Sequence, residues 1–454
     1  MTRILYWNVE NFSINKIANP SRVRQNHTTI SQAVASQDRL NFMLDIFEQA
    51  DPSIIAVVEL ESGRTNRNRL VSYNGQRAAI RLLDEIRERF DNDNWMLVPP
   101  LYAGPTEGVA VFYDSENLSF CGPYQWPGGN GPAVEFPMVP QGYAAPFDAA
   151  LPNRLIPRNA PNAGENENEM AATARDFTYH TGHANAGAPV PFFGRHPYWV
   201  RFAELNGAGG FRRTLNVFAI HAPANAYLAG QYMDQLSETA QIVDNIAANE
   251  ARVVVGDFNL NLMYDDDVRT LNAHYTNMTA APANYAIGIN RLGAPPPPPA
   301  GANPAGSMYD GYYATHLTSW YGAQYYSTNG EAQFYPGYGF IGSNYVNNTY
   351  AIDNIFARYG GAGAAGGPMQ DVTVMNALTG SPYRTLAYYN PPPPALNAPL
   401  GAVVVRNETN VAPFTLAPDV APAYRAGVLQ SFRNWWNYGL IRSTSDHLPI
   451  VADV

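Results

Sequence analysis

The sequence predicts a single α/β domain in which apolar strands alternate with amphipathic helices. Two observations carry this prediction. Apolar runs that end in polar residues recur along the chain, and segments with apolar residues at helical spacing lie between them. Carboxylates, amides and imidazoles follow apolar runs near both termini, so the first and last strands must contribute to one site. We therefore expect one domain over residues 1–454.

The elements follow from periodicity and from residues that end them. A strand within residues 1–10 closes on polar side chains. A helix over residues 38–50 is predicted because Leu40, Met43 and Phe47 share one face, and the Asp-Pro pair that follows ends it. Further strands are expected at residues 54–59, 108–113, 198–202, 214–221, 252–257, 351–356 and 448–454, and further helices at 76–90, 231–248 and 423–438.

Three long insertions are expected between these elements, at about residues 122–190, 262–349 and 358–420. They are rich in Pro, Gly, Ala and Asn and show little periodicity. The stretch from Tyr309 to Tyr350 contains ten tyrosines. Because long loops on a rigid scaffold tend to carry specificity, we expect this stretch to shape the choice of substrate.

Composition narrows the function classes. A net charge of −10 argues against a broad nucleic-acid-binding face, although it allows a local basic cleft. Cys121 is the one cysteine, which excludes an internal disulfide and a cysteine-based zinc site. The chain has no apolar run long enough for a transmembrane segment. No signal peptide is evident, which favours a cytoplasmic location, but a secreted protein whose signal had been removed would look the same.

Oxygen donors at strand ends predict a site for a hard divalent cation. Glu59 closes a buried strand and is the first candidate ligand, Asp446 is the second, and Asn8 and Glu10 would support them. Magnesium prefers one or two carboxylates and keeps several waters. The sequence therefore predicts Mg²⁺, or Mn²⁺, as the cofactor.

The run of three valines before Gly-Asp-Phe-Asn predicts a strand that delivers two polar side chains to the same place. Asp257 and Asn259 point the same way by the two-residue period of a strand. One could orient or deprotonate a water while the other donates a hydrogen bond to a phosphate oxygen. The alternative is an Asx-type turn with no chemical role.

Two histidines are candidates for acid–base catalysis, and each would need an orienting partner. They are His221 and His447, and the natural partners are Glu107 and Asp353. Asp353 lies in an otherwise apolar strand, where a buried carboxylate requires a cationic partner or hydrogen bonds. Spacing alone does not establish which carboxylate meets which imidazole.

Taken in order, these motifs resemble the endonuclease/exonuclease/phosphatase superfamily. The resemblance is carried by Trp-Asn-x-x-Asn-Phe, the Glu59 strand, the His221 segment, Gly-Asp-Phe-Asn, Ile-Asp353 and Ser-Asp-His-x-Pro, and it spans the chain apart from the insertions. It implies a four-layer α/β sandwich with two central mixed β-sheets, and a phosphoesterase that depends on Mg²⁺ or Mn²⁺.

The resemblance also implies roles for individual residues. Asn8 and Glu59 would hold the metal with Asp446 close by, Asp257 would position or activate the attacking water, and Asn259 would contact the phosphoryl group. His447 would pair with Asp353. His221 with Glu107 looks like the second histidine–carboxylate pair of deoxyribonuclease I, and Arg195 matches its phosphate-contacting arginine.

These features predict a phosphodiesterase that hydrolyses DNA or RNA, as an endonuclease, with nucleic acid as its partner. AP endonucleases and inositol polyphosphate 5-phosphatases are disfavoured because their signatures around the aspartate are absent at Ala351-Ile352-Asp353-Asn354. A sphingomyelinase-type enzyme acting on lipid or sugar phosphodiesters is one alternative. A binding protein that keeps the fold without catalysis is another, which the complete set of polar residues argues against.

Overall fold

The fold is described from a computed structural model. The residues that it describes are 1–18, 36–62, 71–102 except 72, 106–122, 191–289 except 196, 244, 261, 265 and 266, 315, 326–328, 331–333, 352–361, 369–376, 381–384 and 444–454.

The first sheet has eight strands in the order β17-β16-β18-β1-β2-β5-β3, with β4 paired to β5. Strands β1 and β2 are parallel, whereas the other pairs are antiparallel, so the sheet is mixed. Its first and last strands along the chain, β1 and β18, are direct neighbours. The strands are β1 (Arg3–Phe12), β2 (Ile54–Glu61), β3 (Trp95–Leu97), β4 (Leu101–Tyr102), β5 (Glu107–Asp114), β16 (Gln370–Asn376), β17 (Ser381–Arg384) and β18 (Ile450–Asp453).

The second sheet has six strands in the order β12-β15-β9-β8-β7-β6 and is also mixed, with β8 parallel to β9. The strands are β6 (Leu118–Phe120), β7 (Tyr198–Leu205), β8 (Phe211–His221), β9 (Glu250–Asp257), β12 (Ala286–Ile287) and β15 (Asp353–Tyr359). Two short pairs lie apart from both sheets, namely β10 (Met263–Tyr264) with β11 (Asp267–Leu271), and β13 (Tyr326–Thr328) with β14 (Glu331–Gln333).

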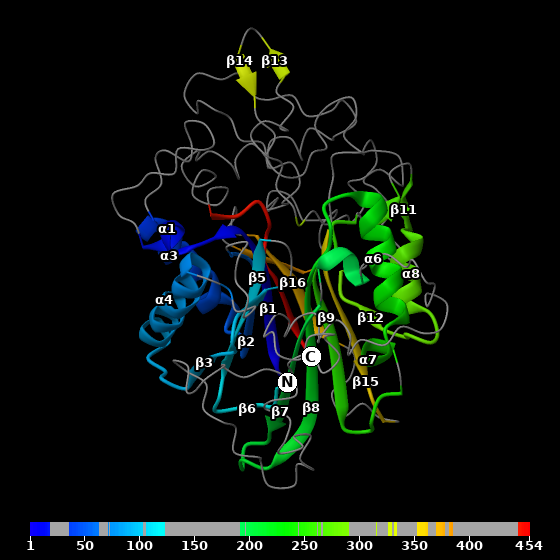
Figure 1. Ribbon diagram of the computed structural model, residues 1–454, viewed down its shortest axis with the longest axis horizontal. Coiled ribbons are helices and arrows are strands. Elements are labelled where there is room, and N and C mark those ends of the chain that lie inside the picture. Colours follow the sequence, from blue (N-terminus) through cyan, green and yellow to red (C-terminus); the bar gives the residue numbers. More distant parts are fainter. Residues whose placement is uncertain are drawn as a thin grey trace, which may run out of the picture.

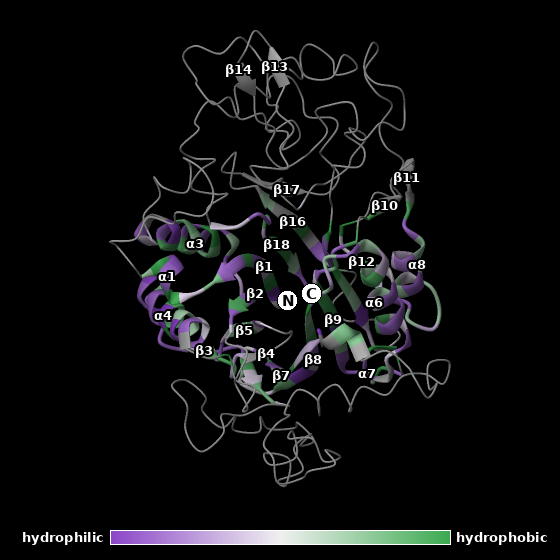
Figure 2. Cartoon of the chain, turned by 45° about the horizontal axis from the view of Figure 1, so that its top comes forward, coloured by the Kyte–Doolittle hydropathy of each residue, from purple (hydrophilic) through white to green (hydrophobic). Residues whose placement is uncertain are grey.

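Helices cover the outer face of each sheet, so that the described chain forms four layers (Figure 1). The first sheet carries α1 (Ile14–Ile17), α3 (Ser36–Ala50) and α4 (Tyr73–Phe90), and the second carries α6 (Ala226–Glu238), α7 (Ala240–Val243) and α8 (Ala273–Thr279). Hydrophilic residues lie on these helices, while the strands between them are largely apolar (Figure 2). The predicted four-layer α/β sandwich with two mixed sheets is confirmed by this arrangement.

Alternation along β1 shows how the two cores are divided. Ile4 and Tyr6 belong to the core that the first sheet shares with the second sheet. Leu5 and Trp7 belong to the core between the first sheet and its helices α3 and α4. All four are buried, which is expected for a central strand covered on both faces. The end of β1 therefore lies between both sheets, where residues from each can meet.

Several elements differ from the sequence expectation. Helix α6 ends at Glu238, not at residue 248, because Thr239 is extended and its hydroxyl bonds the carbonyl of Gln235. Residues 262–289, expected to begin an insertion, form β10, β11, α8 and β12 and contribute buried residues such as Tyr275 to the core. Strands β16 and β17 likewise extend the first sheet from the segment expected as the third insertion. The predicted helix 423–438 and most of the three insertions lie outside the described residues.

Among the described helices, none combines the length and apolar character that crossing a membrane would require.

Candidate active site

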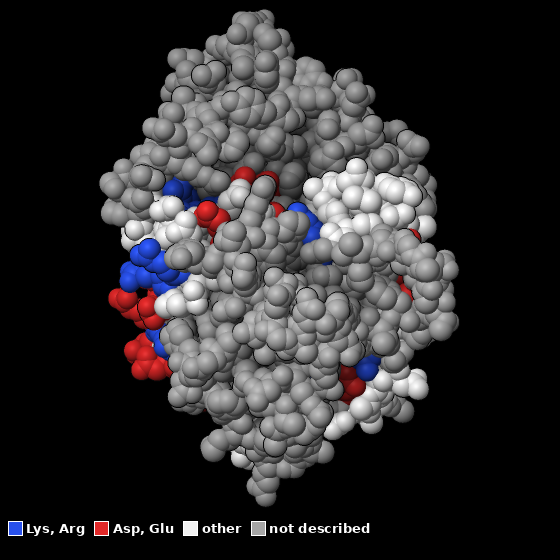
Figure 3. Space-filling model, viewed as in Figure 1, with Lys and Arg blue, Asp and Glu red and all other residues white. Residues whose placement is uncertain are grey.

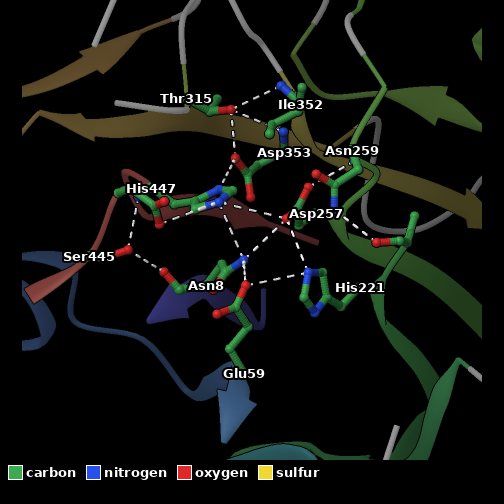
Figure 4. A network of polar contacts seen from close by, with 12 residues as sticks. Asn8, Glu59, His221, Asp257, Asn259, Thr315, Ile352, Asp353, Ser445 and His447 are labelled. Atoms are coloured by element: carbon green, nitrogen blue, oxygen red, sulfur yellow. Dashed lines mark hydrogen bonds and ion pairs between the residues drawn. The ribbon is translucent and has the colours of Figure 1, made fainter. Parts of the chain in front are cut away.

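Residues of five strands, β1, β2, β8, β9 and β15, and of the segment before β18 meet at one rim between the sheets. Parallel pairing aligns Asn8 with Val58, the residue before Glu59, and His221 with Asp257. Antiparallel pairing then sets Asp353 opposite Asp257. The side chains of Asn8, Glu59, His221, Asp257 and His447 point toward one another in this space (Figure 4).

The amide of Asn8 lies at the centre of the cluster. Its Nδ2 is 3.0 Å from Glu59 Oε1, 3.1 Å from Asp257 Oδ2 and 3.3 Å from His447 Nε2. With the two carboxylates as neighbours, the amide orientation that places nitrogen inward is the one that makes hydrogen bonds, and a protonated Nε2 of His447 is a neighbour that does not accept from it. The other amide atom, Oδ1, is buried and has no hydrogen-bond partner among the residues that the structure describes. Asn8 thus connects the two sheets, and its Oδ1 is left as an oxygen atom that could bind a metal ion.

Glu59 is held in an uncommon backbone conformation. Its φ is +62°, in the left-handed region, at the point where the pairing between β2 and β5 shifts register. Asn11 is also left-handed, with φ +52°, and its main-chain N–H donates to Glu59 Oε2 (3.1 Å). Non-glycine residues in this region store strain that the surrounding structure must hold, and such residues cluster at functional sites. Here the bulge aims the Glu59 carboxylate at Asn8.

His447 is oriented by a buried aspartate. Its Nδ1 lies 2.8 Å from Asp353 Oδ2, and its Nε2 faces the cluster, 3.7 Å from Asp257 Oδ2. Burial by itself lowers the pKa of His447, but the charges of Asp353 and Asp257 outweigh it and hold that pKa well above its usual range. His447 is therefore an imidazolium at neutral pH.

Thr315 completes the support of Asp353. Its hydroxyl donates to Asp353 Oδ2 (2.7 Å) and accepts from the main-chain N–H groups of Asp353 (3.0 Å) and Ile352 (3.1 Å). Its carbonyl accepts from Leu448 N (2.7 Å), one residue beyond His447. Thr315 therefore fixes the aspartate and the histidine segment at the same time.

Asp257 and Asn259 form a tight turn at the end of β9. The N–H of Asn259 donates to Asp257 Oδ1 (2.8 Å), and its Nδ2 donates to Asp257 Oδ2 (3.2 Å) and to the carbonyl of Ala222 (2.8 Å). Burial, the largest cause, raises the pKa of Asp257 to about 6, against the lowering effect of the His447 charge. The Asx-type turn is thus present, and it holds a carboxylate whose pKa is close to neutrality.

His221 meets Glu107 across the two sheets. Its Nδ1 is 2.8 Å from Glu107 Oε2, and its Nε2 is 3.4 Å from Glu59 Oε1 and 3.6 Å from Asp257 Oδ2. Arg195 lies beyond Glu107, with Nη1 3.3 Å from Oε2, and also donates to the carbonyl of Ala222 (3.2 Å).

The pKa values of this second pair move in opposite directions. Burial lowers the pKa of His221, but the hydrogen bond to Glu107 and the charges of Glu59 and Asp257 outweigh it, so the net shift is upward. Burial likewise raises the pKa of Glu107, but the hydrogen bond and charge of His221 lower it more, with help from Arg195. The two shifts therefore favour the charged form of each partner, the imidazolium of His221 and the carboxylate of Glu107.

The remaining candidates lie at the margin of the cluster. Asp446 Oδ1 is 3.7 Å from His447 Nε2. The main-chain carbonyl of Glu10 accepts from Lys16.

On the face drawn in Figure 3, acidic and basic residues of the described chain gather around a hollow above the middle of the molecule.

Two sets of side chains could hold a cation. Glu59 and Asn8 offer hard oxygen ligands. The buried Oδ1 of Asn8 accepts no hydrogen bond from the described residues, which fits a role as a ligand of a cation. Asp257, Asp353 and His447 form the other set, with ligand atoms within 4.8 Å of one another. All three residues of this second set are buried, whereas in the first set Asn8 is wholly buried but the Glu59 side chain is 18 % exposed. Because Mg²⁺ keeps several waters, the Asn8–Glu59 set suits it better.

Three residues that hold the site residues in place were not predicted from the sequence. Thr315 comes from a stretch with no periodicity, and no motif marks it. Trp7 Nε1 donates to the carbonyl of His447 (2.9 Å), and Tyr6 Oη accepts from the N–H of Asp257 (2.7 Å). Both aromatic residues directly precede Asn8 in the sequence, and this position could have indicated that they support the site.

No protein-family model matches the chain, and no curated protein matches it significantly. Several solved structures are similar to it. An endonuclease/exonuclease/phosphatase family protein from Leptotrichia buccalis is 10 % identical with a TM-score of 0.40, covering 100 % of this chain and 99 % of that chain. D. rerio TDP2 complexed with single strand DNA product is 8 % identical with a TM-score of 0.38, covering 99 % and 97 %. An AP endonuclease from Archaeoglobus fulgidus is 11 % identical with a TM-score of 0.34, covering 100 % and 99 %.

The family named for the first of these proteins is the one that the sequence motifs resemble. What the structure itself confirms is the predicted fold class, which the two mixed sheets and their flanking helices define. With identities of 8–11 % and TM-scores of 0.34–0.40, these likenesses carry nothing about substrate, metal or activity. Those questions rest on the side chains of this site.

The His221–Glu107 pair predicts a window of pH in which it stabilises the fold. The folded-state pKa of His221 is raised, so its contribution is fully present below the unfolded value of 6.5 and is lost as pH rises through the folded pKa. The folded-state pKa of Glu107 is lowered, so its contribution is present above the unfolded value of 4.5 and is lost as pH falls through the folded pKa. Both contributions are complete between about pH 4.5 and 6.5.

Chemical denaturation of the metal-free protein and of Glu107→Gln from pH 4 to 9 measures this contribution. The difference in free energy of unfolding should be largest at about pH 5–6 and should shrink toward both ends of the range. A difference that does not vary with pH would show that the pair is not ionised in the folded protein.

Proposed function

We propose that the chain is a metal-dependent phosphodiesterase that cleaves a phosphodiester bond by attack of an activated water. The observation that supports it most is the state of the three ionisable groups that face each other. Asp257 has a pKa of about 6, while His447 and His221 both have raised pKa values. A carboxylate with a pKa near neutrality and two imidazoles whose surroundings favour the protonated form therefore face one space.

Asp257 is the general base of this proposal. At neutral pH it is mostly ionised, and a pKa near the working pH favours proton transfer. It would accept a proton as the water oxygen bonds to phosphorus. The hydrogen bonds from Asn8 and Asn259 fix the carboxylate for this task.

The two histidines complete the proton and charge balance. His447, held by Asp353, would place its positive charge against the phosphoryl oxygens. His221, held by Glu107, would give its Nε2 proton to the leaving oxygen as the phosphorus–oxygen bond breaks. Arg195, behind Glu107, would contact the phosphate from the same side.

Asn259 has less freedom than the sequence suggested. Both hydrogens of its amide are directed at chain acceptors, the carboxylate of Asp257 and the carbonyl of Ala222. Its part in this proposal is therefore first to hold Asp257, and a contact with the phosphoryl group would require one of those bonds to be exchanged.

A divalent cation would be held by Glu59 and Asn8, with Asp446 within reach. Five carboxylates lie within 3.7 Å of two imidazoles here, so a cation would offset the excess of negative charge. When bound, it would supply a Lewis acid that neutralises charge on the phosphoryl oxygens.

Nucleic acid is the substrate that we favour, because two histidine–carboxylate pairs are the pattern that resembles deoxyribonuclease I. A panel of DNA, RNA and phospholipid substrates distinguishes this from a sphingomyelinase-type activity. Failure to hydrolyse any phosphodiester, with or without metal, would leave the binding-protein alternative.

Activity should require Mg²⁺ or Mn²⁺. Hydrolysis of bis(p-nitrophenyl) phosphate should stop in excess EDTA and return when either ion is added back, since the donors are hard oxygen atoms. Full activity in excess chelator would contradict the metal-dependent proposal.

Asp257→Asn and His447→Ala should each lower kcat by roughly 10²–10⁴-fold, the range typical of general acid–base groups. The double variant should lose far less than the product of the two effects if the residues act as a unit. The matched control is His274→Ala, which breaks a histidine–aspartate contact of 2.8 Å to Asp234 on the outer helices and should leave kcat unchanged. Strictly multiplicative losses would show that Asp257 and His447 act independently.

A further inference from the structure

Tyr6 makes a polar contact from one sheet to the other directly beneath the site. It lies in β1 of the first sheet and is wholly buried. Its hydroxyl accepts from the main-chain N–H of Asp257 (2.7 Å) and donates to the carbonyl of Ile220 (3.3 Å), both in the second sheet. A phenol can do both at once, because it carries one donor and lone pairs that accept.

The hydroxyl occupies a specific position in the pairing of β8 and β9. In a parallel ladder with His221 aligned to Asp257, the Asp257 N–H faces the carbonyl of Ile220. The next bond of that ladder, from Ala222 N to the carbonyl of Asp257, is formed at 2.8 Å. Tyr6 therefore contacts both groups of the last ladder position before the catalytic carboxylate.

The two strands are also unusually close at this position. A Cβ atom added to Gly256 would lie 2.4 Å from the carbonyl oxygen of Ile220 and 2.2 Å from its side chain. Because the strands are so close here, a change in the hydrogen bonds of the Ile220 carbonyl is expected to shift the end of β9, where Asp257 lies. The Asp257 N–H and the Ile220 carbonyl are also partners in the pairing of β8 with β9, so the phenol oxygen of Tyr6 bonds to both groups of that ladder position.

Strand β1 consequently holds Asp257 at two points. Tyr6 fixes the main-chain nitrogen, and Asn8, two residues further on the same face, fixes carboxylate Oδ2 at 3.1 Å. The main chain of Asp257 is paired with β8 and β15, and these two contacts from β1 add the constraint that orients the carboxylate toward the first sheet.

We propose that Tyr6 is a positioning residue that sets the carboxylate of Asp257 against Asn8 and His447 by holding the Asp257 main chain from the opposite sheet. The kinetic part of this proposal rests on the proposed phosphodiesterase function. Its structural part does not.

Tyr6→Phe removes the hydroxyl and keeps the ring. With bis(p-nitrophenyl) phosphate and saturating Mg²⁺, kcat should fall about 10- to 100-fold, the loss expected when a reacting group is displaced by a fraction of an ångström to one ångström. KM should change little, because the substrate contacts remain. The matched control is Tyr285→Phe, which removes a buried hydroxyl that donates to the carbonyl of Ile242 (2.7 Å) and should leave kcat unchanged.

A crystal structure of Tyr6→Phe provides the second readout. The separation of Asn8 Nδ2 and Asp257 Oδ2 should increase from 3.1 Å to beyond about 3.5 Å, outside hydrogen-bonding distance. An unchanged separation would overturn the proposal, and so would a kcat within twofold of the parent or an equal loss in Tyr285→Phe. If the parent chain hydrolyses no phosphodiester, the proposed function fails, and the crystal structure alone decides the role of Tyr6.

Discussion

The hydrogen bonds of the Asn8 amide are the constraint on which the rest of the site depends. One nitrogen lies within 3.3 Å of a glutamate, an aspartate and a histidine that come from three separate segments of the chain. Each of these three groups bears or exchanges charge, and a buried charged group without partners is costly. The position of Asn8 at the end of β1, between both sheets, makes these contacts possible.

The residues around Asn8 in β1 extend the same arrangement. Tyr6 bonds the main chain of Asp257, Trp7 bonds the carbonyl of His447, and the carbonyl of Asn8 accepts from Ser445. Alternation along the strand sends these contacts to opposite faces, which lets one short segment hold both the second sheet and the segment before β18. The site is therefore assembled from long-range contacts, and its precision depends on how the two sheets pack.

The sequence predicted several residues that the fold brings together in the cluster, but it did not predict the residues that support them. Asn8, Glu59, Asp257 and His447 could be found because each is a polar residue beside an apolar run, and the ends of neighbouring strands can share a rim. The left-handed backbone of Glu59 and Asn259 could not, since nothing local requires φ values of +62° and +48° in these residues. Thr315 could not be predicted either, because its role arises only once Asp353 and Leu448 lie beside it.

We propose that this cluster directs a water molecule onto phosphorus. The product that receives the oxygen atom of that water is therefore the quantity to measure. Single-turnover hydrolysis of a phosphodiester in ¹⁸O-labelled water, followed by mass spectrometry, reports which product gains the label. We predict one ¹⁸O atom in the phosphate-bearing product and none in the leaving alcohol. Label in the alcohol, or an unlabelled phosphate product from the first turnover, would contradict the account.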